Sequence, residues 1–213
     1  MPADEQDLSS KGIIADLPEF AINKGIAGES LLAQILIDKF VDHLPIYRQI
    51  ERFKREDVKI NSSTINGWQE SVCDLLEPLY DELVRQVLSQ GYIQGDETPI
   101  QVLDKQKQGK THRGYYWIYH SPLSRYAFFD YQRGRGKDGP IKLLKNYRGY
   151  LQTDGYSVYD LIQRTNKGIT LMGCLAHARR YFEKALVAGD KEAAYAMDLF
   201  QKLYAVEREA KEA

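Results

Sequence analysis

Two short stretches of this chain have almost the same sequence, and each ends at an aspartate. Residues 91–96 read GYIQGD and residues 149–154 read GYLQTD, so the second aspartate lies 58 positions after the first. In both stretches a short apolar run, which is typical of a buried strand, stops abruptly at a carboxylate. Any fold for this chain has to explain why both strands end in the same way.

The spacing of apolar residues divides the chain into regions. Residues 1–27 are polar and non-periodic, and they predict an extended lead-in. Residues 28–90 predict a helical domain. Apolar residues recur there at helical spacing in three segments, 30–43, 45–53 and 62–91. Pro78 would either kink the third helix or restart it.

The break between the second and third of these helices, EDVKIN, gives the helical domain the outline of a helix-turn-helix. In that arrangement Ser63, Thr64 and Asn66 would face a groove of DNA. The break is longer than the usual turn of roughly three or four residues, and helix pairs of this kind also occur in plain bundles. Both interpretations stay open from the sequence.

From residue 91 the apolar period changes from helical to alternating. Five strands are predicted, at residues 93–103, 113–120, 125–131, 150–154 and 169–173. The first three form an antiparallel meander, and helices separate and follow the last two, so the sheet is mixed and covered by helices. This is the strand order of the ribonuclease-H-like α/β fold, in which the first and fourth strands are neighbours. Asp96 and Asp154 would therefore meet.

We accordingly expect a ribonuclease-H-like core over residues 91–188, with a charged helix from Lys191 onward. The chain has no signal-peptide pattern and no apolar run of the roughly 20 residues that span a membrane, which predicts a soluble, cytoplasmic protein. Its two cysteines, Cys73 and Cys174, exclude a disulfide framework and a four-cysteine zinc site.

Positive charge is concentrated in one part of the chain. The formal net charge of the whole chain is only −1, yet between Val102 and Tyr150 eleven Lys or Arg face three Asp, a local net charge of +8. A segment this basic suits a polyanionic partner such as DNA. The candidate DNA contacts in its loop are Arg133, Arg135 and Lys137. A solvated lysine-rich loop is the alternative for residues 105–110.

Two carboxylates that point into one crevice repel each other unless a cation lies between them. Mg²⁺, or Mn²⁺ in its place, prefers such oxygen ligands, and a pair of ions about 4 Å apart can support in-line phosphoryl transfer. We therefore predict that Asp96 and Asp154 are catalytic metal ligands. Each could instead be a turn former before glycine or at a strand end. Glu97 would point to the opposite face of its strand.

Four residues that follow the last predicted strand are further candidates for the functional site. Cys174 and His177 have the spacing of half a zinc site, but no second half exists, so they are either active-site support or ordinary packing residues. Arg179 and Arg180 follow in the predicted helix and could hold a phosphate or simply be solvated.

Six separated motifs together resemble the transposase family of insertion sequence 66. They are LLAQILIDKFVDHLPIYRQIERF, STINGW, GDETPIQVL, YYWIY, GYLQTDGYSVYD and GCLAHARRYFEKA. The resemblance implies an Asp-Asp-Glu catalytic triad with Mg²⁺, which cuts transposon ends and joins them to target DNA. Asp96 and Asp154 match the first two acids, and Cys174 and His177 match a Cys-x-x-His segment that follows the second acid. The family also implies a homo-oligomer on nucleoid DNA.

The chain departs from the family pattern at both ends. The cysteine-bearing N-terminal region and the Asn-x-x-Glu segment that supplies the third acid are not found among its residues. The resemblance therefore implies a truncated transposase, inactive by itself. Its catalytic core over residues 91–188 would be incomplete, and residues 189–213 would be the start of a helical insertion. The alternatives are a non-catalytic DNA-binding remnant or regulator of transposition and, more distantly, a structure-specific nuclease.

Overall fold

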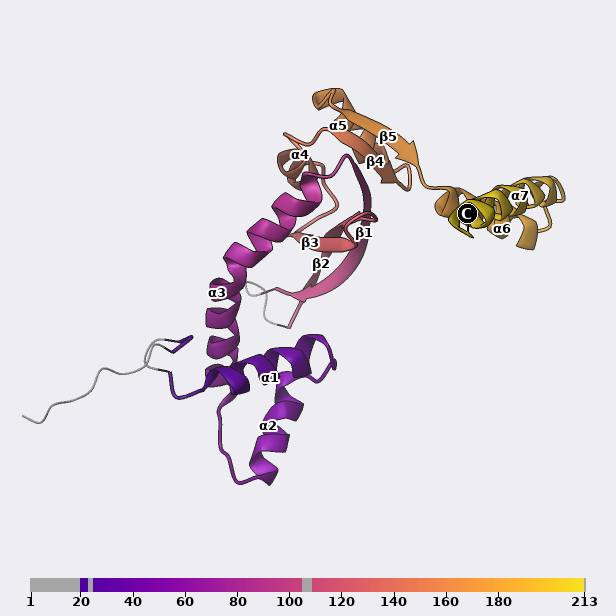
Figure 1. Ribbon diagram of the computed structural model, residues 1–213. Helices are drawn as coiled ribbons and strands as arrows, with labels where there is room; N and C mark the ends of the chain where they lie inside the picture. The colour runs from indigo at the N-terminus through magenta and orange to yellow at the C-terminus, as the bar shows by residue number, and fades with distance from the viewer. Residues whose placement is uncertain (1–19, 23–24, 105–108, 213) are drawn as a thin grey trace, which may run out of the picture. The chain divides into compact units, whose positions relative to one another are not determined.

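The computed structural model describes residues 20–22, 25–104 and 109–212 (Figure 1). Most of the predicted lead-in lies outside these residues, as do Lys105 and Lys107 of the basic segment. The chain forms two compact units, residues 1–78 and 79–213. In the described ranges, no helix combines the length and apolar character that crossing a membrane requires.

The first unit is helical, as predicted. Its helices are α1 (Glu29–Phe40), α2 (Ile46–Arg55) and the first part of α3 (Ser62–Leu88). A small apolar core joins them, formed by Ala27, Leu32, Ile35, Ile65, Trp68 and Val72. Asp38 is buried beside this core, where it pairs with Arg52 and accepts a hydrogen bond from Gln34, so the buried charge is compensated. The third helix continues through Pro78 without ending there.

The second unit is built on a five-stranded mixed sheet in the order β3-β2-β1-β4-β5. The strands are β1 (Tyr92–Leu103), β2 (Thr111–Ser121), β3 (Tyr126–Gln132), β4 (Gly149–Thr153) and β5 (Ile169–Gly173). Strand β2 pairs antiparallel with both β1 and β3, while β4 runs parallel to β1 and β5 runs parallel to β4. The predicted meander, and the predicted contact between the first and fourth strands, are confirmed.

Helices accompany the parallel strands. They are α4 (Asp138–Leu143), α5 (Ser157–Thr165), α6 (Leu175–Val187) and α7 (Glu192–Glu212). Helices α6 and α7 pack on each other, with the rings of Phe182 and Phe200 5.8 Å apart.

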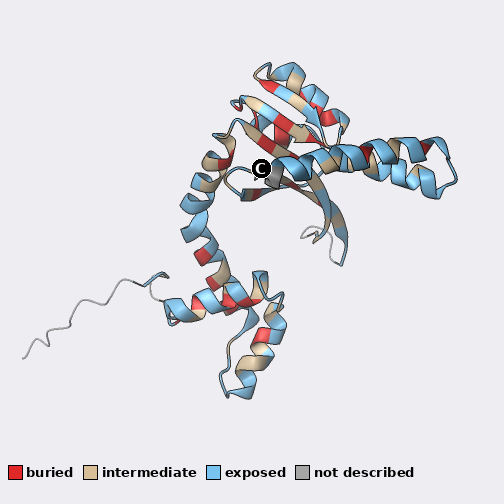
Figure 2. Cartoon of the chain, turned by 45° about the vertical axis from the view of Figure 1, so that its right-hand side comes forward, coloured by how far each residue is buried: buried red, intermediate tan, exposed pale blue. Residues whose placement is uncertain are grey.

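One face of the sheet forms the main core. Inward-facing strand residues such as Ile93, Trp117 and Leu151 are fully buried there, in one cluster with Tyr159 and Ile162 of α5. Figure 2 shows buried residues, in red, on the strands of the sheet. The last turns of α3 pack on the same core through four apolar side chains, Leu83, Val84, Val87 and Leu88. Alternation along each strand therefore separates a buried face from an open one.

The two similar stretches of sequence are neighbours in the sheet, residue against residue. The parallel register pairs Ile93 with Leu151 and Gln94 with Gln152, an offset of 58 positions along the whole contact. The two glutamines bond directly, since Nε2 of Gln94 lies 2.8 Å from Oε1 of Gln152. At the start of the pairing the Tyr150 amide donates to the Gly91 carbonyl at 2.8 Å.

Gly149 allows this close approach, and we predict that it cannot be replaced. Its φ is +144°, and a Cβ at this position would lie 2.4 Å from the Gly91 carbonyl oxygen. Gly149→Ala should therefore lower the free energy of unfolding by about 1–3 kcal/mol, measured by urea denaturation. Gly91→Ala is the matched control, because its Cβ would meet no atom within 4 Å. Equal effects of the two substitutions would contradict this account.

Candidate functional site

Asp96 and Asp154 come to the same edge of the sheet. Asp96 lies within β1. Asp154 was predicted to be the last residue of the fourth strand, but β4 ends one residue earlier, at Thr153, and Asp154 follows it directly. The parallel pairing ends with Gln94 and Gln152, and each aspartate lies two residues further along its own segment. Because side chains alternate, Asp96 projects from the open face of the sheet, which it shares with Gln94. The strand register is the one the prediction required, and the role of the two carboxylates as metal ligands stays a prediction.

Each carboxylate is oriented by a backbone amide. Oδ1 of Asp96 accepts a hydrogen bond from the Glu97 amide at 2.8 Å. Oδ1 of Asp154 accepts one from the Tyr156 amide at 2.9 Å, across Gly155, whose φ of +87° turns the chain away from the strand. The Asp96 side chain is 53% exposed, so it is accessible to a ligand.

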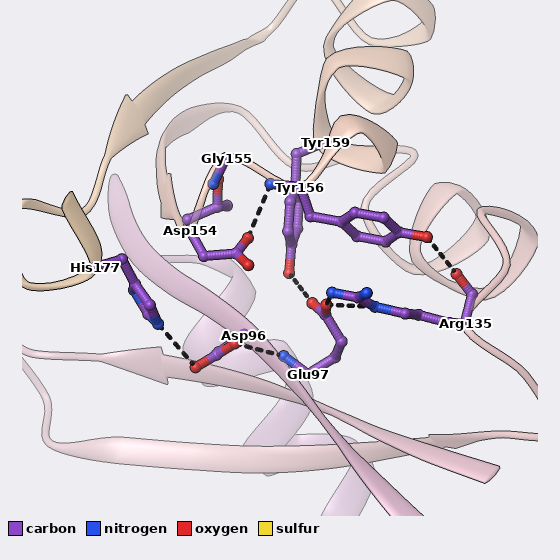
Figure 3. A network of polar contacts seen from close by, with 9 residues as sticks. Asp96, Glu97, Arg135, Asp154, Gly155, Tyr156, Tyr159 and His177 are labelled. Atoms are coloured by element: carbon purple, nitrogen blue, oxygen red, sulfur yellow. Dashed lines mark hydrogen bonds and ion pairs between the residues drawn. The ribbon is translucent and has the colours of Figure 1, made fainter. Parts of the chain in front are cut away.

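Glu97 lies on the opposite, buried face of β1, as alternation predicts. Only 2% of its side chain is exposed, and it pairs with Arg135, which reaches it from the loop after β3 (Figure 3). Nε of Arg135 donates to Oε1 of Glu97 at 2.8 Å, and the Tyr159 hydroxyl lies 3.4 Å from Oε2. A carboxylate so thoroughly buried requires such partners.

The electrostatics of this group couple it to both aspartates. Burial raises the pKa of the Glu97 carboxyl above its ordinary value, and the charges of Asp154 and Asp96 act in the same direction, while Arg135 opposes them. Burial also raises the pKa of the Tyr159 hydroxyl, with further contributions from the nearby acids. Tyr159 is therefore a neutral donor to Glu97 at ordinary pH.

A cavity of about 250 Å³ opens beside Asp96. Asp96, Cys174 and His177 all contribute to its lining. His177 lies in the first turn of α6, and its Nε2 is 3.8 Å from Oδ2 of Asp96. Its Nδ1 is buried without a hydrogen-bond partner among the described residues. The Cys174 amide donates to the Thr153 carbonyl at 2.8 Å, which fixes the start of α6 at the end of β4.

A polar network that the sequence did not predict forms another wall of this cavity. Oε1 of Gln94 is 3.0 Å from Nδ1 of His120, and Gln152 accepts hydrogen bonds from both Gln94 and the Tyr92 hydroxyl. The sequence contained one signal of this network, the glutamine that both similar stretches share. Because side chains alternate along a strand, each glutamine lies on the same face as the aspartate two residues later.

The basic candidates fall in four different settings. Arg135 is engaged with Glu97, whereas Lys137 is exposed and Arg133 lies 3.7 Å from Asp104. Arg179 and Arg180 line a separate cavity of about 860 Å³ between α6 and α7. They are not among the residues that surround the cavity at Asp96.

The helix-turn-helix candidates belong to the first unit. Ser63 and Asn66 are exposed at the beginning of α3, and Thr64 is half-buried. Ile65 and Trp68, between and after them, face the core of that unit. The exposed side of this helical turn is thus polar and open to solvent.

The described residues contain no complete set of metal ligands. Within residues 20–22, 25–104 and 109–212, no group of three or more His, Cys, Asp or Glu side chains is arranged to hold a metal ion. Glu97 lies next in sequence to Asp96, but its carboxylate is on the other face of β1 and is held by Arg135. Asp96 and Asp154 would need ligands from elsewhere to complete a coordination shell.

Comparison with known proteins finds relatives of this chain. Two relatives from Sinorhizobium fredii (strain NBRC 101917 / NGR234) are named only as uncharacterized proteins y4qI and y4jD. The first is 32% identical over 200 residues, which cover 86% of this chain and 36% of the relative. The second is 29% identical over 208 residues, or 92% of this chain and 40% of the relative. The chain therefore spans less than half the length of these relatives.

A family model described as "Transposase IS66 family" matches residues 24–213, which include the helical unit, the sheet and both aspartates. The chain belongs to the IS66 transposase family.

Proposed function

We propose that this chain carries the part of a DNA transposase that contributes two metal-binding aspartates, on a ribonuclease-H-like fold. The observation that carries the proposal is the parallel register of β1 and β4. It pairs the residues two positions before Asp96 and Asp154, so both aspartates are expected at one edge of the sheet. Membership of a transposase family makes DNA the expected substrate. A third carboxylate would come from outside the residues described here, in keeping with the greater length of the relatives.

The residues present fit Mg²⁺ or Mn²⁺ in part. Asp96 is accessible, and the second oxygen of each aspartate is not used by the amide that orients the first. Carboxylate oxygens are the ligands that these ions prefer. Bound metal would supply charge stabilisation and an activated nucleophile for phosphoryl transfer. The protein itself would position the DNA phosphate against Asp96, beside which His177 and the open cavity lie.

Metal binding gives the first test. We expect Mn²⁺ to bind the 213-residue chain weakly in a calorimetric titration, because two carboxylates offer only part of a ligand set. Asp96→Asn and Asp154→Asn should each lower the affinity by about tenfold or more, since each removes a ligand charge. Asp160→Asn, which removes the same charge from an exposed position on α5, is the matched control. Equal affinity in all three variants would refute the metal site.

Catalysis gives the second prediction. We expect no strand joining by the 213-residue chain on matched transposon ends with Mg²⁺ or Mn²⁺, because removing one member of a catalytic unit abolishes most of its activity. The assay is a gel-based cleavage and joining reaction, run beside a mock preparation. Joining that is robust and is lost in Asp96→Ala would show that the chain already holds every acid it needs.

A second function, DNA binding without catalysis, is favoured by one observation. The described residues lack a complete group of metal ligands, yet the loop after β3 presents exposed basic side chains such as Lys137. The same chain could then occupy DNA ends at the nucleoid and regulate an intact transposase. This proposal depends on the basic segment between Val102 and Tyr150 and not on the aspartates.

Salt dependence tests this binding. The affinity for a short duplex, measured by fluorescence anisotropy, should fall steeply as salt is raised. Arg133→Gln and Lys137→Gln should each weaken binding and reduce the slope of log affinity against log salt by about one. Lys202→Gln, on α7 and paired with Asp198, should leave that slope unchanged. A uniform effect of all three would mean that the loop is not the contact surface.

A further inference from the structure

We propose that Glu97 and Arg135 form a positioning pair that holds the carboxylates of Asp96 and Asp154 in a fixed relation to each other. This inference rests on the proposed metal-binding role of the two aspartates. Neither member of the pair would touch the metal or the DNA, because their shared ion pair is on the opposite face of β1 from Asp96. Arg135, a DNA-contact candidate from sequence, thereby receives a different role.

The first link runs from the pair to Asp96 through one residue of backbone. Glu97 is anchored by the ion pair with Arg135 and by the Tyr159 hydroxyl, and its side chain is 2% exposed. Its own amide donates to Oδ1 of Asp96 at 2.8 Å. Any rotation of Glu97 about the strand axis would move this amide, and the Asp96 carboxylate would lose its orienting bond.

The second link runs from the pair to Asp154 through Tyr156. The guanidinium of Arg135 lies 3.9 Å from the centre of the Tyr156 ring, and the Tyr156 hydroxyl lies 3.2 Å from the Arg135 carbonyl oxygen. The amide of the same tyrosine donates to Oδ1 of Asp154 at 2.9 Å. Figure 3 shows the continuous chain of contacts from Asp96 to Asp154.

Arginine suits this position better than lysine would. Its planar group bonds Glu97 through two nitrogens and also offers a flat face to Tyr156. Arg135 lies in an irregular loop that contains Gly134 and Gly136. Because no helix or strand holds this loop in place, the contacts of Arg135 with Glu97 and Tyr156 restrain it. Lysine retains the charge, but it has neither the fork nor the flat face.

The proposal and a purely electrostatic effect predict different results for Arg135→Lys. Because the charge is unchanged, electrostatics alone predicts no change in Mn²⁺ affinity. A positioning role predicts that affinity falls about tenfold, the lower end of the effect of mutating groups that orient metal ligands. Arg164→Lys, an exposed position on α5, is the control and should stay within about twofold of wild type.

Amide hydrogen exchange gives a second readout that needs no metal. The amides of Glu97 and Tyr156 each donate to one of the aspartates, so Arg135→Lys should accelerate exchange at both, and Arg164→Lys at neither. Unchanged Mn²⁺ affinity together with unchanged exchange in a folded Arg135→Lys protein would overturn the positioning pair. If the wild-type chain binds no Mn²⁺, the proposed function is wrong, and exchange alone decides this inference.

A further pair of variants covers the case in which Arg135→Lys does not fold. Tyr156 is only half-buried, so both of its variants should retain the fold, which far-UV circular dichroism would verify. Tyr156→Phe keeps the ring beneath the guanidinium, whereas Tyr156→Leu removes it. We expect weaker Mn²⁺ binding and faster exchange at both amides for leucine than for phenylalanine. Identical behaviour of the two would count against the inference.

Discussion

The parallel pairing of β1 with β4 is the constraint on which the candidate site depends. Its register matches two similar stretches position by position, so that tyrosine meets tyrosine, an apolar residue meets an apolar residue, and glutamine meets glutamine. Parallel strands joined by a crossover place their carboxyl ends at one edge of a sheet, which is where ligands bind in open α/β folds. The two aspartates follow strand segments that are in register, and Gly149 lets those strands approach each other.

Beneath this edge lies a carboxylate, that of Glu97, whose side chain is almost fully covered. Glu97 projects on the same face of β1 as Ile93, among aromatic side chains. Burying a charge is unfavourable unless it is paired and hydrogen-bonded, and Arg135 and Tyr159 meet that requirement. The interaction ties a loop to a strand and a helix, which explains how an irregular segment can be ordered beside the site.

Much of the fold could be predicted from the sequence, because it follows from periodicity. Alternation identified the five strands, and the strand order gave the contact between β1 and β4. Alternation also set Glu97 apart from Asp96, since neighbouring residues in a strand face opposite ways. The ribonuclease-H-like assignment and the roles of His177 and the basic residues stay predictions. What periodicity could not supply was the partner of Glu97, because Arg135 lies 38 positions away in a loop without a period.

The register has a consequence for how the sequence can change length. Insertions into the loop between β1 and β2 add little closure entropy and leave the pairing of β1 with β4 unaltered. A single residue inserted between Gln94 and Asp96 would instead turn the aspartate to the buried face and expose whatever follows it. The site therefore tolerates added length in the loop between β1 and β2, but not over the few positions that precede each aspartate.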